Sequence, residues 1–366
     1  MKIDHIHFFV EDAARQRNRF IEQLGWTFVK RATLCDRNLE VLRYRDTLFA
    51  LSSPRTATSP VAQYLRTHAP GVANVAIQVE NLAAAQRRLG RLSHPRGSAL
   101  QNKEPQAATA AILSQLAELD GPARLPAWAN IAGWGGLSHT LIERRSPADS
   151  LASSLASPPQ GIDHIVLNVP TGELQPAVEF YGCLFELQKQ QRFNIQTEQS
   201  GLNSQVLFAP SSQLYFNINE PTSPRSQIQT FLDANHGAGI QHIALHSEPI
   251  VPTVTALRQR GVPLLSVPLT YYRQLQERLR ACRVNPVQAS EWHQIVEQQI
   301  LLDWQPKQPE SLLLQIFSQP IFSEPTFFLS LLSGAGPFRA LVRATFWPFT
   351  KPLRRRQRRS ANLATL

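Results

Sequence analysis

The chain repeats itself, and this repeat constrains the fold more than any other feature of the sequence. The segment Ile3-Asp-His-Ile6 recurs as Ile162-Asp-His-Ile165, and both copies continue with apolar residues at alternate positions and then with a helix-like segment. A second pair of matching segments, His68–Ile77 and His236–Leu245, stands in the same order in the two halves. The offsets between the two pairs are 159 and 168 residues. We therefore interpret the chain as a duplication in which each half forms one module.

Within each half, the pattern predicts two strand–helix–strand units, which together make an α+β fold. The expected modules are residues 1–145 and 161–328, joined by a proline-bearing linker at 146–160. An alanine-rich stretch at 101–126 reads as a helical insertion in the first module. Helices are expected at 82–92 and 250–261, and further strands at 39–44, 47–52, 204–208 and 213–218.

The composition suits two ordinary domains with substantial cores. The chain has 366 residues, of which 43% are hydrophobic and 17% are charged. Its three cysteines, Cys35, Cys183 and Cys282, are far apart and lack the spacing of a disulfide framework or a thiolate zinc site. The residues after Met1 contain no apolar signal segment, so we expect a cytoplasmic protein.

The net charge of +10 comes from one end of the chain. No Asp or Glu follows Glu324, whereas eight Lys or Arg residues lie between Arg339 and Arg359. The body without them has 29 basic and 27 acidic residues, and is nearly neutral. We therefore expect neither a nucleic-acid nor a membrane partner for the body of the protein.

The two copies differ at one place that matters for metal binding. The matched positions are His164 and His242 in the second half, but His5 and Asn74 in the first. Two imidazoles at neighbouring strand starts can bind a divalent metal, whereas an imidazole and an amide make a much poorer site. The sequence therefore predicts one metal, in the second module. We interpret the remaining candidates, His5, His7 and His139, as structural.

Five sequence blocks in order over residues 161–320 resemble those of 4-hydroxyphenylpyruvate dioxygenases, especially cyanobacterial members. The block Gly161–Val169 is similar to the strand that carries the first iron ligand in that family, and Ser226–Leu245 is similar to its second ligand block. The other three blocks are Ser200–Ser204, Ile218–Pro221 and Leu314–Pro320. The resemblance implies tandem vicinal-oxygen-chelate modules built of βαβββ units, each a curved mixed sheet around a cavity.

The same resemblance implies a chemistry. The family holds one Fe(II) between two His and one carboxylate, and converts 4-hydroxyphenylpyruvate and O2 to homogentisate and CO2. That reaction serves tyrosine and phenylalanine catabolism and supplies plastoquinone and tocopherol precursors. By this resemblance His164 and His242 would be the metal ligands. The substrate would be bound by neutral amides and a hydroxyl with one aromatic wall, namely Ser204, Asn219, Gln227, Gln241, Gln315 and Phe317.

The sequence departs from the family at its C-terminal end. Ser330 stands where the family has its third ligand, a Glu, and the family's closing helix is absent. Reading the codons of residues 339–354 in another frame is compatible with that helix, and the same frame allows a Glu codon across residues 329 and 330. We therefore interpret 329–366 as an out-of-frame tail that impairs activity. The competing interpretation is a basic tail for a membrane surface or a nucleic acid.

Other functions remain open from the sequence alone. A 4-hydroxymandelate synthase would use the same substrate and metal but hydroxylate the side chain. A non-catalytic binding protein of the superfamily would keep the fold without the reaction; the two His and the pocket amides speak against it. A homo-oligomer is compatible with the sequence.

Overall fold

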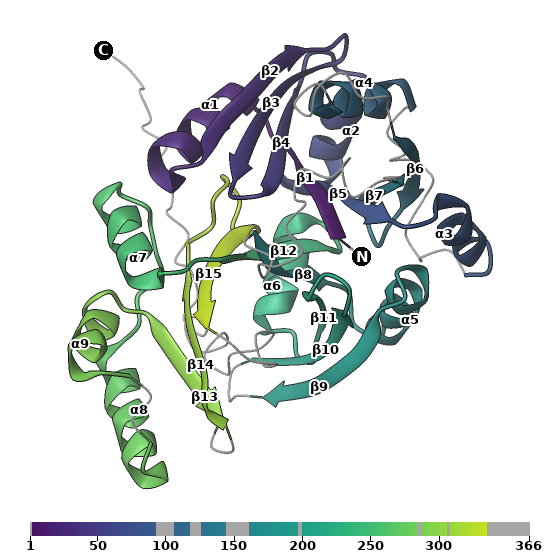
Figure 1. Ribbon diagram of the computed structural model, residues 1–366. Helices are drawn as coiled ribbons and strands as arrows, with labels where there is room; N and C mark the ends of the chain where they lie inside the picture. The colour runs from purple at the N-terminus through teal and green to yellow at the C-terminus, as the bar shows by residue number, and fades with distance from the viewer. Residues whose placement is uncertain are drawn as a thin grey trace, which may run out of the picture.

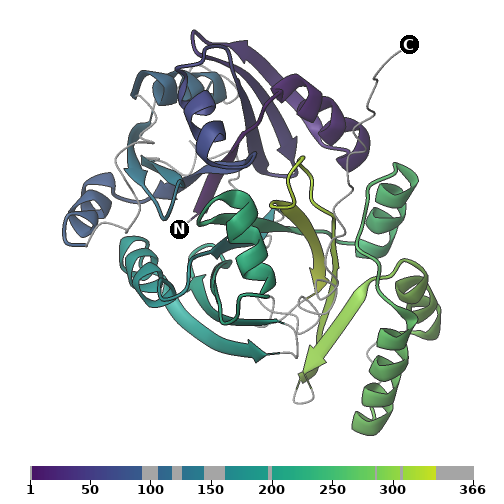
Figure 2. The same ribbon diagram turned by 180° about the vertical axis from the view of Figure 1, so that it is seen from behind.

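The computed structural model describes residues 2–92, 106–117, 126–143, 161–196, 200–284, 287–305 and 308–334. The expected linker at 146–160 and the basic tail beyond residue 334 lie outside these ranges. The described residues form two sheets with helices, one sheet in each half of the chain (Figures 1 and 2).

The first sheet has seven strands in the order β2-β3-β4-β1-β5-β7-β6. Its strands are β1 (Lys2–Phe9), β2 (Thr27–Thr33), β3 (Arg37–Tyr44), β4 (Thr47–Pro54), β5 (Gly71–Val79), β6 (Ala127–Ala132) and β7 (Ser138–Glu143). Its helices are α1 (Ala13–Arg19), continued by a π-helical turn η1 (Phe20–Leu24), α2 (Pro60–Thr67), α3 (Leu82–Leu89) and α4 (Gln106–Ala117).

The second sheet has eight strands in the order β13-β14-β15-β12-β8-β11-β10-β9. Its strands are β8 (Ile162–Asn168), β9 (Gln188–Gln196), β10 (Gly201–Ala209), β11 (Leu214–Pro221), β12 (Gly239–His246), β13 (Leu301–Gln305), β14 (Gln308–Phe317) and β15 (Phe328–Gly334). Its helices are α5 (Leu174–Leu184), α6 (Gln227–Asn235), α7 (Ile250–Gln259), α8 (Leu269–Cys282) and α9 (Ala289–Glu297).

The two sheets have the same topology, as the repeat predicts. Read from opposite ends, the strand orders match one to one, and the second sheet adds only β13. Local chemistry repeats as well. The turns between β3 and β4 and between β10 and β11 place Arg45 and Gln213 at positive φ, 53° and 56°. Both modules also end their first helix with a left-handed residue, Gly25 or Glu186. The fold is therefore a tandem duplication of an α+β module with a curved mixed sheet.

One face of each sheet contributes to the same continuous apolar core. This core includes Phe8 and Ile77 from the first sheet and Leu167 and Leu245 from the second. The opposite, concave faces carry α2 and α4 in the first module and α6 in the second. In the second module Phe231 and its neighbours on α6 pack against Leu202 of β10, and Figure 1 shows this helix inside the curve of the sheet. The concave faces therefore remain for side chains that do not join the shared core.

Most expected elements appear with small changes at their ends. The helices expected at 82–92 and 250–261 end at Leu89 and Gln259. The helical insertion is α4, and the four expected strands are β3, β4, β10 and β11. The chain after Phe328, expected as a tail, begins with a strand that reaches Gly334 and pairs with both β12 and β14.

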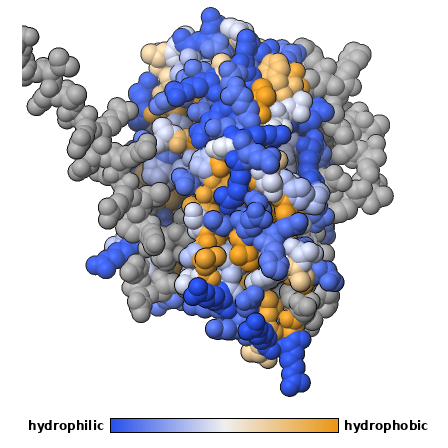
Figure 3. Space-filling model, turned by 90° about the vertical axis from the view of Figure 1, so that its left-hand side faces the viewer, coloured by the Kyte–Doolittle hydropathy of each residue, from blue (hydrophilic) through white to orange (hydrophobic). Residues whose placement is uncertain are grey.

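The surface is mostly polar on the side that Figure 3 presents, with apolar residues gathered down its middle. Among the described residues, Phe28 and Leu269 are the large hydrophobic side chains that are exposed. No helix in the described part of the chain is long and apolar enough to cross a membrane.

Candidate functional site

Three neighbouring strands of the second sheet bring His164, His242 and Ser330 to one face. His164 on β8 lies opposite Ala244 on β12, and Ala244 lies opposite Ser330 on β15. His242 is two residues before Ala244, so its side chain points to the same face. The two imidazole rings are 5.5 Å apart between centroids, at 79° to one another. The face is concave and all three residues are buried.

Asp163 orients the first of these histidines. His164 Nδ1 lies 2.9 Å from Asp163 Oδ1, so Nδ1 donates to the carboxylate and Nε2 is the ring nitrogen that a metal would meet. The other carboxylate oxygen of Asp163 lies 3.4 Å from Nε2 of His246. A carboxylate behind an imidazole is the arrangement that fixes the tautomer of metal-binding histidines.

His242 lies between aromatic rings. The ring of Phe328 stacks on it at 4.7 Å and 17°, and Phe317 meets it edge-on at 6.1 Å. Burial, and then the neighbouring His164, hold the pKa of His242 well below 6.5. The ring is therefore neutral at pH 7, which is the form that binds metals. Its Nδ1 is buried and has no hydrogen-bond partner among the described residues.

The concave face also carries polar side chains whose hydrogen-bonding capacity is unfilled. Gln315 on β14 donates from Nε2 to Ser330 Oγ at 2.7 Å, which leaves its own Oε1 without a partner in the described part of the chain. Farther along the sheet the same holds for three buried oxygens: Ser204 Oγ, Asn219 Oδ1 and Gln227 Oε1. Buried polar atoms are rarely left unsatisfied, so this face fits a polar ligand.

The register explains how these distant residues meet. Ser204 pairs with Asn219, which pairs with Asn168 on β8, four residues beyond His164. Phe317 pairs with Ser330. Paired residues share a face, so Ser204, Asn219 and Phe317 all lie on the face of His164. Gln227 is the first residue of α6, and Gln241 lies at a register irregularity of β12 immediately before His242.

Some residues of this face were not among the sequence candidates. Phe328 stacks on His242, and Asn168 accepts a hydrogen bond at 3.2 Å from Asn219 Nδ2. Asn168 could have been found by counting in steps of two from His164 along the strand. Phe328 could not, because its place beside His242 depends on the pairing of β15 with β12.

The first module closes the equivalent face with its own side chains. Asn74, the counterpart of His242, donates to Ser138 Oγ at 2.9 Å and to Thr140 Oγ1 at 3.1 Å. His7 bonds Ser52 Oγ at 2.8 Å. Helix α4 then covers the face, since Ile112 and Leu116 pack against apolar residues of β3 and β4. Among the described residues of the first module, these side chains and α4 therefore occupy the face that carries the candidate ligands in the second.

The donor set of the second module fits a divalent metal in part. His164 and His242 offer two imidazoles, but the described residues include no group of three or more His, Cys, Asp and Glu side chains placed to hold a metal ion. Ser330 lies where a third side chain would complete such a group, and its hydroxyl is neutral. The geometry is that of a two-histidine site with a serine beside it.

A family model and a solved structure indicate the superfamily and the fold to which this chain is similar. Residues 163–277 match the family model described as the Glyoxalase/Bleomycin resistance protein/Dioxygenase superfamily. The chain superposes on a solved mutant of 4-hydroxymandelate synthase from Streptomyces coelicolor with a TM-score of 0.70, covering 92% of this chain and 94% of that one. The identity is 23%, so this likeness describes the fold.

Two relatives found by sequence similarity indicate which family of this superfamily the chain belongs to. The chain is 32% identical over 352 residues to slr0090 of Synechocystis, described as uncharacterized, covering 94% of this chain and 97% of that protein. It is 30% identical over 312 residues to the 4-hydroxyphenylpyruvate dioxygenase of Pyricularia oryzae, covering 77% of this chain and 69% of the relative. The chain belongs to the 4-hydroxyphenylpyruvate dioxygenase family, and so to a family of dioxygenase enzymes.

Proposed function

We propose that the second module binds one Fe(II) through His164 and His242, and that the protein converts 4-hydroxyphenylpyruvate and O2 to homogentisate and CO2. The observation that carries the proposal is the meeting of two imidazoles on a concave face whose buried polar atoms are unfilled. On the equivalent face of the first module Asn74 takes the place of the second ligand, and α4 covers the face. Metal and substrate are therefore assigned to the second module alone.

A bound ferrous ion would supply the redox chemistry with O2 and a binding point for a 2-oxo acid. The chain's own part is to hold the ion and to orient it. Asp163 keeps Nε2 of His164 available, and burial keeps His242 neutral. Ser330 contributes a hydroxyl, which does not balance the metal's charge as a carboxylate would.

The polar residues farther along the sheet suit the other end of the substrate. Asn168 is four residues from His164 on β8, which is about 13 Å along a strand. The unfilled oxygens of Ser204, Asn219 and Gln227 are in this region and can accept a hydrogen bond from a phenol. Gln315, beside Ser330, is at the metal end, where a carboxylate would be bound.

The aromatic residues would shape the space between these ends. Phe317 and Phe328 lie against His242 from two directions. Their rings can contact an aromatic substrate and keep water away from the metal end. Exclusion of water protects reactive species formed in such a reaction.

The test is to supply the protein with Fe(II), O2 and 4-hydroxyphenylpyruvate and to identify the products. The expected products are CO2 and homogentisate. Formation of 4-hydroxymandelate would replace the proposed activity with that of the synthase. Binding of the substrate without turnover, in both the protein as it stands and a frame-restored version with Glu near position 330, would indicate a non-catalytic binding protein.

A further inference from the structure

The loop between β14 and β15, residues 318–327, belongs to the second module but lies against the first. Phe322 is 5.7 Å from Phe8 and 6.4 Å from Phe20 between ring centroids. Phe327 is 5.1 Å from Phe8. Both loop rings are buried, so the core of the first module holds this loop by two aromatic side chains.

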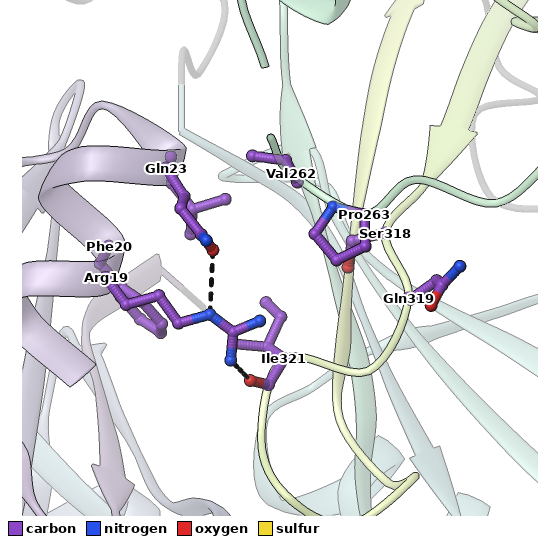
Figure 4. Close-up of a pocket in the computed structure, with 9 residues that line it drawn as sticks. Arg19, Phe20, Gln23, Val262, Pro263, Ser318, Gln319 and Ile321 are labelled. Carbon is purple, nitrogen blue, oxygen red and sulfur yellow. Dashed lines mark hydrogen bonds between the residues drawn. The ribbon is translucent and has the colours of Figure 1, made fainter. Parts of the chain in front are cut away.

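Arg19, the last residue of α1, adds a polar contact to the same loop. Its Nη1 donates to the backbone oxygen of Ile321, and its Nε donates to Gln23 Oε1 at 2.9 Å. Figure 4 shows the guanidinium reaching across from the helix to Ile321, between Gln23 and the loop. The bond to Gln23 fixes the orientation of the guanidinium group. The bond to Ile321 is therefore made by a half-buried cation whose direction is already set.

The loop is in turn bonded to the strand that completes the candidate site. Ser318 receives a hydrogen bond on Oγ from the Leu329 amide at 3.0 Å, and its own amide donates to the Leu329 oxygen at 2.9 Å. The Ile321 amide donates to the Phe327 oxygen at 2.9 Å. The residue after Phe327 is Phe328, whose ring stacks on His242. A shift of the loop therefore displaces both Phe328 and β15.

We propose that Arg19 is a positioning residue, through which the first module sets the placement of β15 beside His242. The first module thereby serves the site without contacting metal or substrate. The consequence for metal binding rests on the proposed function, whereas the consequence for the strand does not.

The experiment compares Arg19→Met, Arg19→Lys and the control Arg15→Met, which removes an exposed cation from the same helix. Amide hydrogen exchange is measured by mass spectrometry in peptides that cover 318–334. Loss of a charge-assisted hydrogen bond is expected to speed exchange there by about tenfold or more in Arg19→Met. Arg19→Lys should restore part of the protection, because its ammonium can still donate to Ile321. Arg15→Met should leave exchange unchanged, and peptides from β8 to β11 serve as the internal reference.

The second measurement is the affinity of the intact protein and each variant for Co(II), followed by its visible absorption. Arg19→Met should bind Co(II) more weakly by about three- to tenfold, with a changed spectrum, and Arg19→Lys should recover much of the difference. Phe322→Leu, which shortens the second contact, should act in the same direction in both measurements. Unchanged exchange in 318–334 in both Arg19→Met and Phe322→Leu would overturn the proposal.

The two proposals fail in different ways. If the unsubstituted protein binds no Co(II), the metal site of the proposed function is wrong, and the exchange experiment still decides the role of Arg19. If Co(II) binds but its affinity and spectrum are the same in all variants, the metal site stands and Arg19 does not position it.

Discussion

At the scale of single residues, the same carboxylate–histidine pair occurs in each module: an Asp is followed by a His whose ring it contacts. Asp163 contacts His164 and His246, and Asp4 in the first module contacts His5 and accepts a hydrogen bond from Gln78. The pair is also present in the module that has Asn74 at the position of His242. It is therefore part of the shared architecture and does not by itself mark a metal site.

Replacing His242 with Ala should abolish binding of Fe(II) or Co(II), because it removes one of the two proposed ligand imidazoles. His5→Ala is the matched control from the equivalent pair and should leave metal content intact. Metal per chain, measured after loading and desalting, checks both. A normal metal content in His242→Ala would refute the assignment of the site to the second module.

Ser330→Glu should strengthen metal binding by about tenfold or more, since it adds an anionic oxygen to the face of the two imidazoles. The strand register supports this expectation, because Ser330 on β15 pairs with Ala244 on β12, the strand of His242, and with Phe317 on β14. Ser330→Ala is the control and should not raise the affinity. Activity should rise furthest in the frame-restored protein, which regains the carboxylate and the closing helix together. Equal turnover by the chain as it stands and the frame-restored chain would show that Ser330 suffices.

At the scale of elements, the helix α4 distinguishes the two modules most clearly. Ile112 and Leu116 join one apolar cluster with β3 and β4, and Leu113 joins another with Ala76 and Ile142. Asn130 on β6 also donates to Thr109 of the helix at 2.6 Å. The alanine-rich insertion therefore fills the concave face of the first module, whereas the equivalent face of the second module carries polar side chains.

Ile112→Ala should destabilise the protein by about 2–4 kcal/mol, because it leaves a cavity between α4 and the sheet. Ser114→Ala, on a partly exposed side of the same helix, should change stability by less than about 0.5 kcal/mol. Urea unfolding followed by tryptophan fluorescence measures both. A cost as small for Ile112→Ala as for Ser114→Ala would mean that α4 does not pack as described.

The sequence predicts those features of the fold that the residue pattern within one segment determines. Alternating apolar residues and the repeat located β1, β5, β8 and β12, and the same alternation placed His164 and His242 at equivalent points. The strand β15 beside His242 and the packing of α4 over the first face depend on contacts between distant segments. Residue patterns within one segment do not carry that information, so Phe328 was missed and residues 329–334 were expected to belong to a tail.

At the scale of the whole molecule, His139 and Tyr181 link the modules by hydrogen bonds. His139 on β7 bonds the Val75 oxygen through Nδ1, at 3.1 Å, so its Nε2 accepts from the Tyr181 hydroxyl at 3.1 Å. That hydroxyl also accepts from the Trp134 amide at 3.0 Å. Burial lowers the pKa of His139 from 6.5 to about 4. The contact therefore requires the neutral imidazole.

Acid should weaken the association of the two modules. The folded pKa of His139 is depressed, so the unfolded chain binds the proton more readily, and stability falls as the pH drops from about 6.5 towards 4. In His139→Gln this loss should be smaller by about 1–3 kcal/mol, because the titrating group is gone. Urea unfolding at pH 7, 6 and 5 makes the comparison. Parallel losses in the two proteins would show that His139 does not contribute to the pH dependence.

The place of β15 in its sheet has a consequence for the order in which the protein can be built on the ribosome. All seven strands of the first sheet have been synthesised once residue 143 is made. In the second sheet β15 lies between β14 and β12, although it is the last of them in the chain. Until residues 328–334 emerge, the edge of β12 that β15 will cover remains unpaired next to His242. Ribosomes that stop before this strand would therefore release chains with a finished first module and an open, aggregation-prone second one.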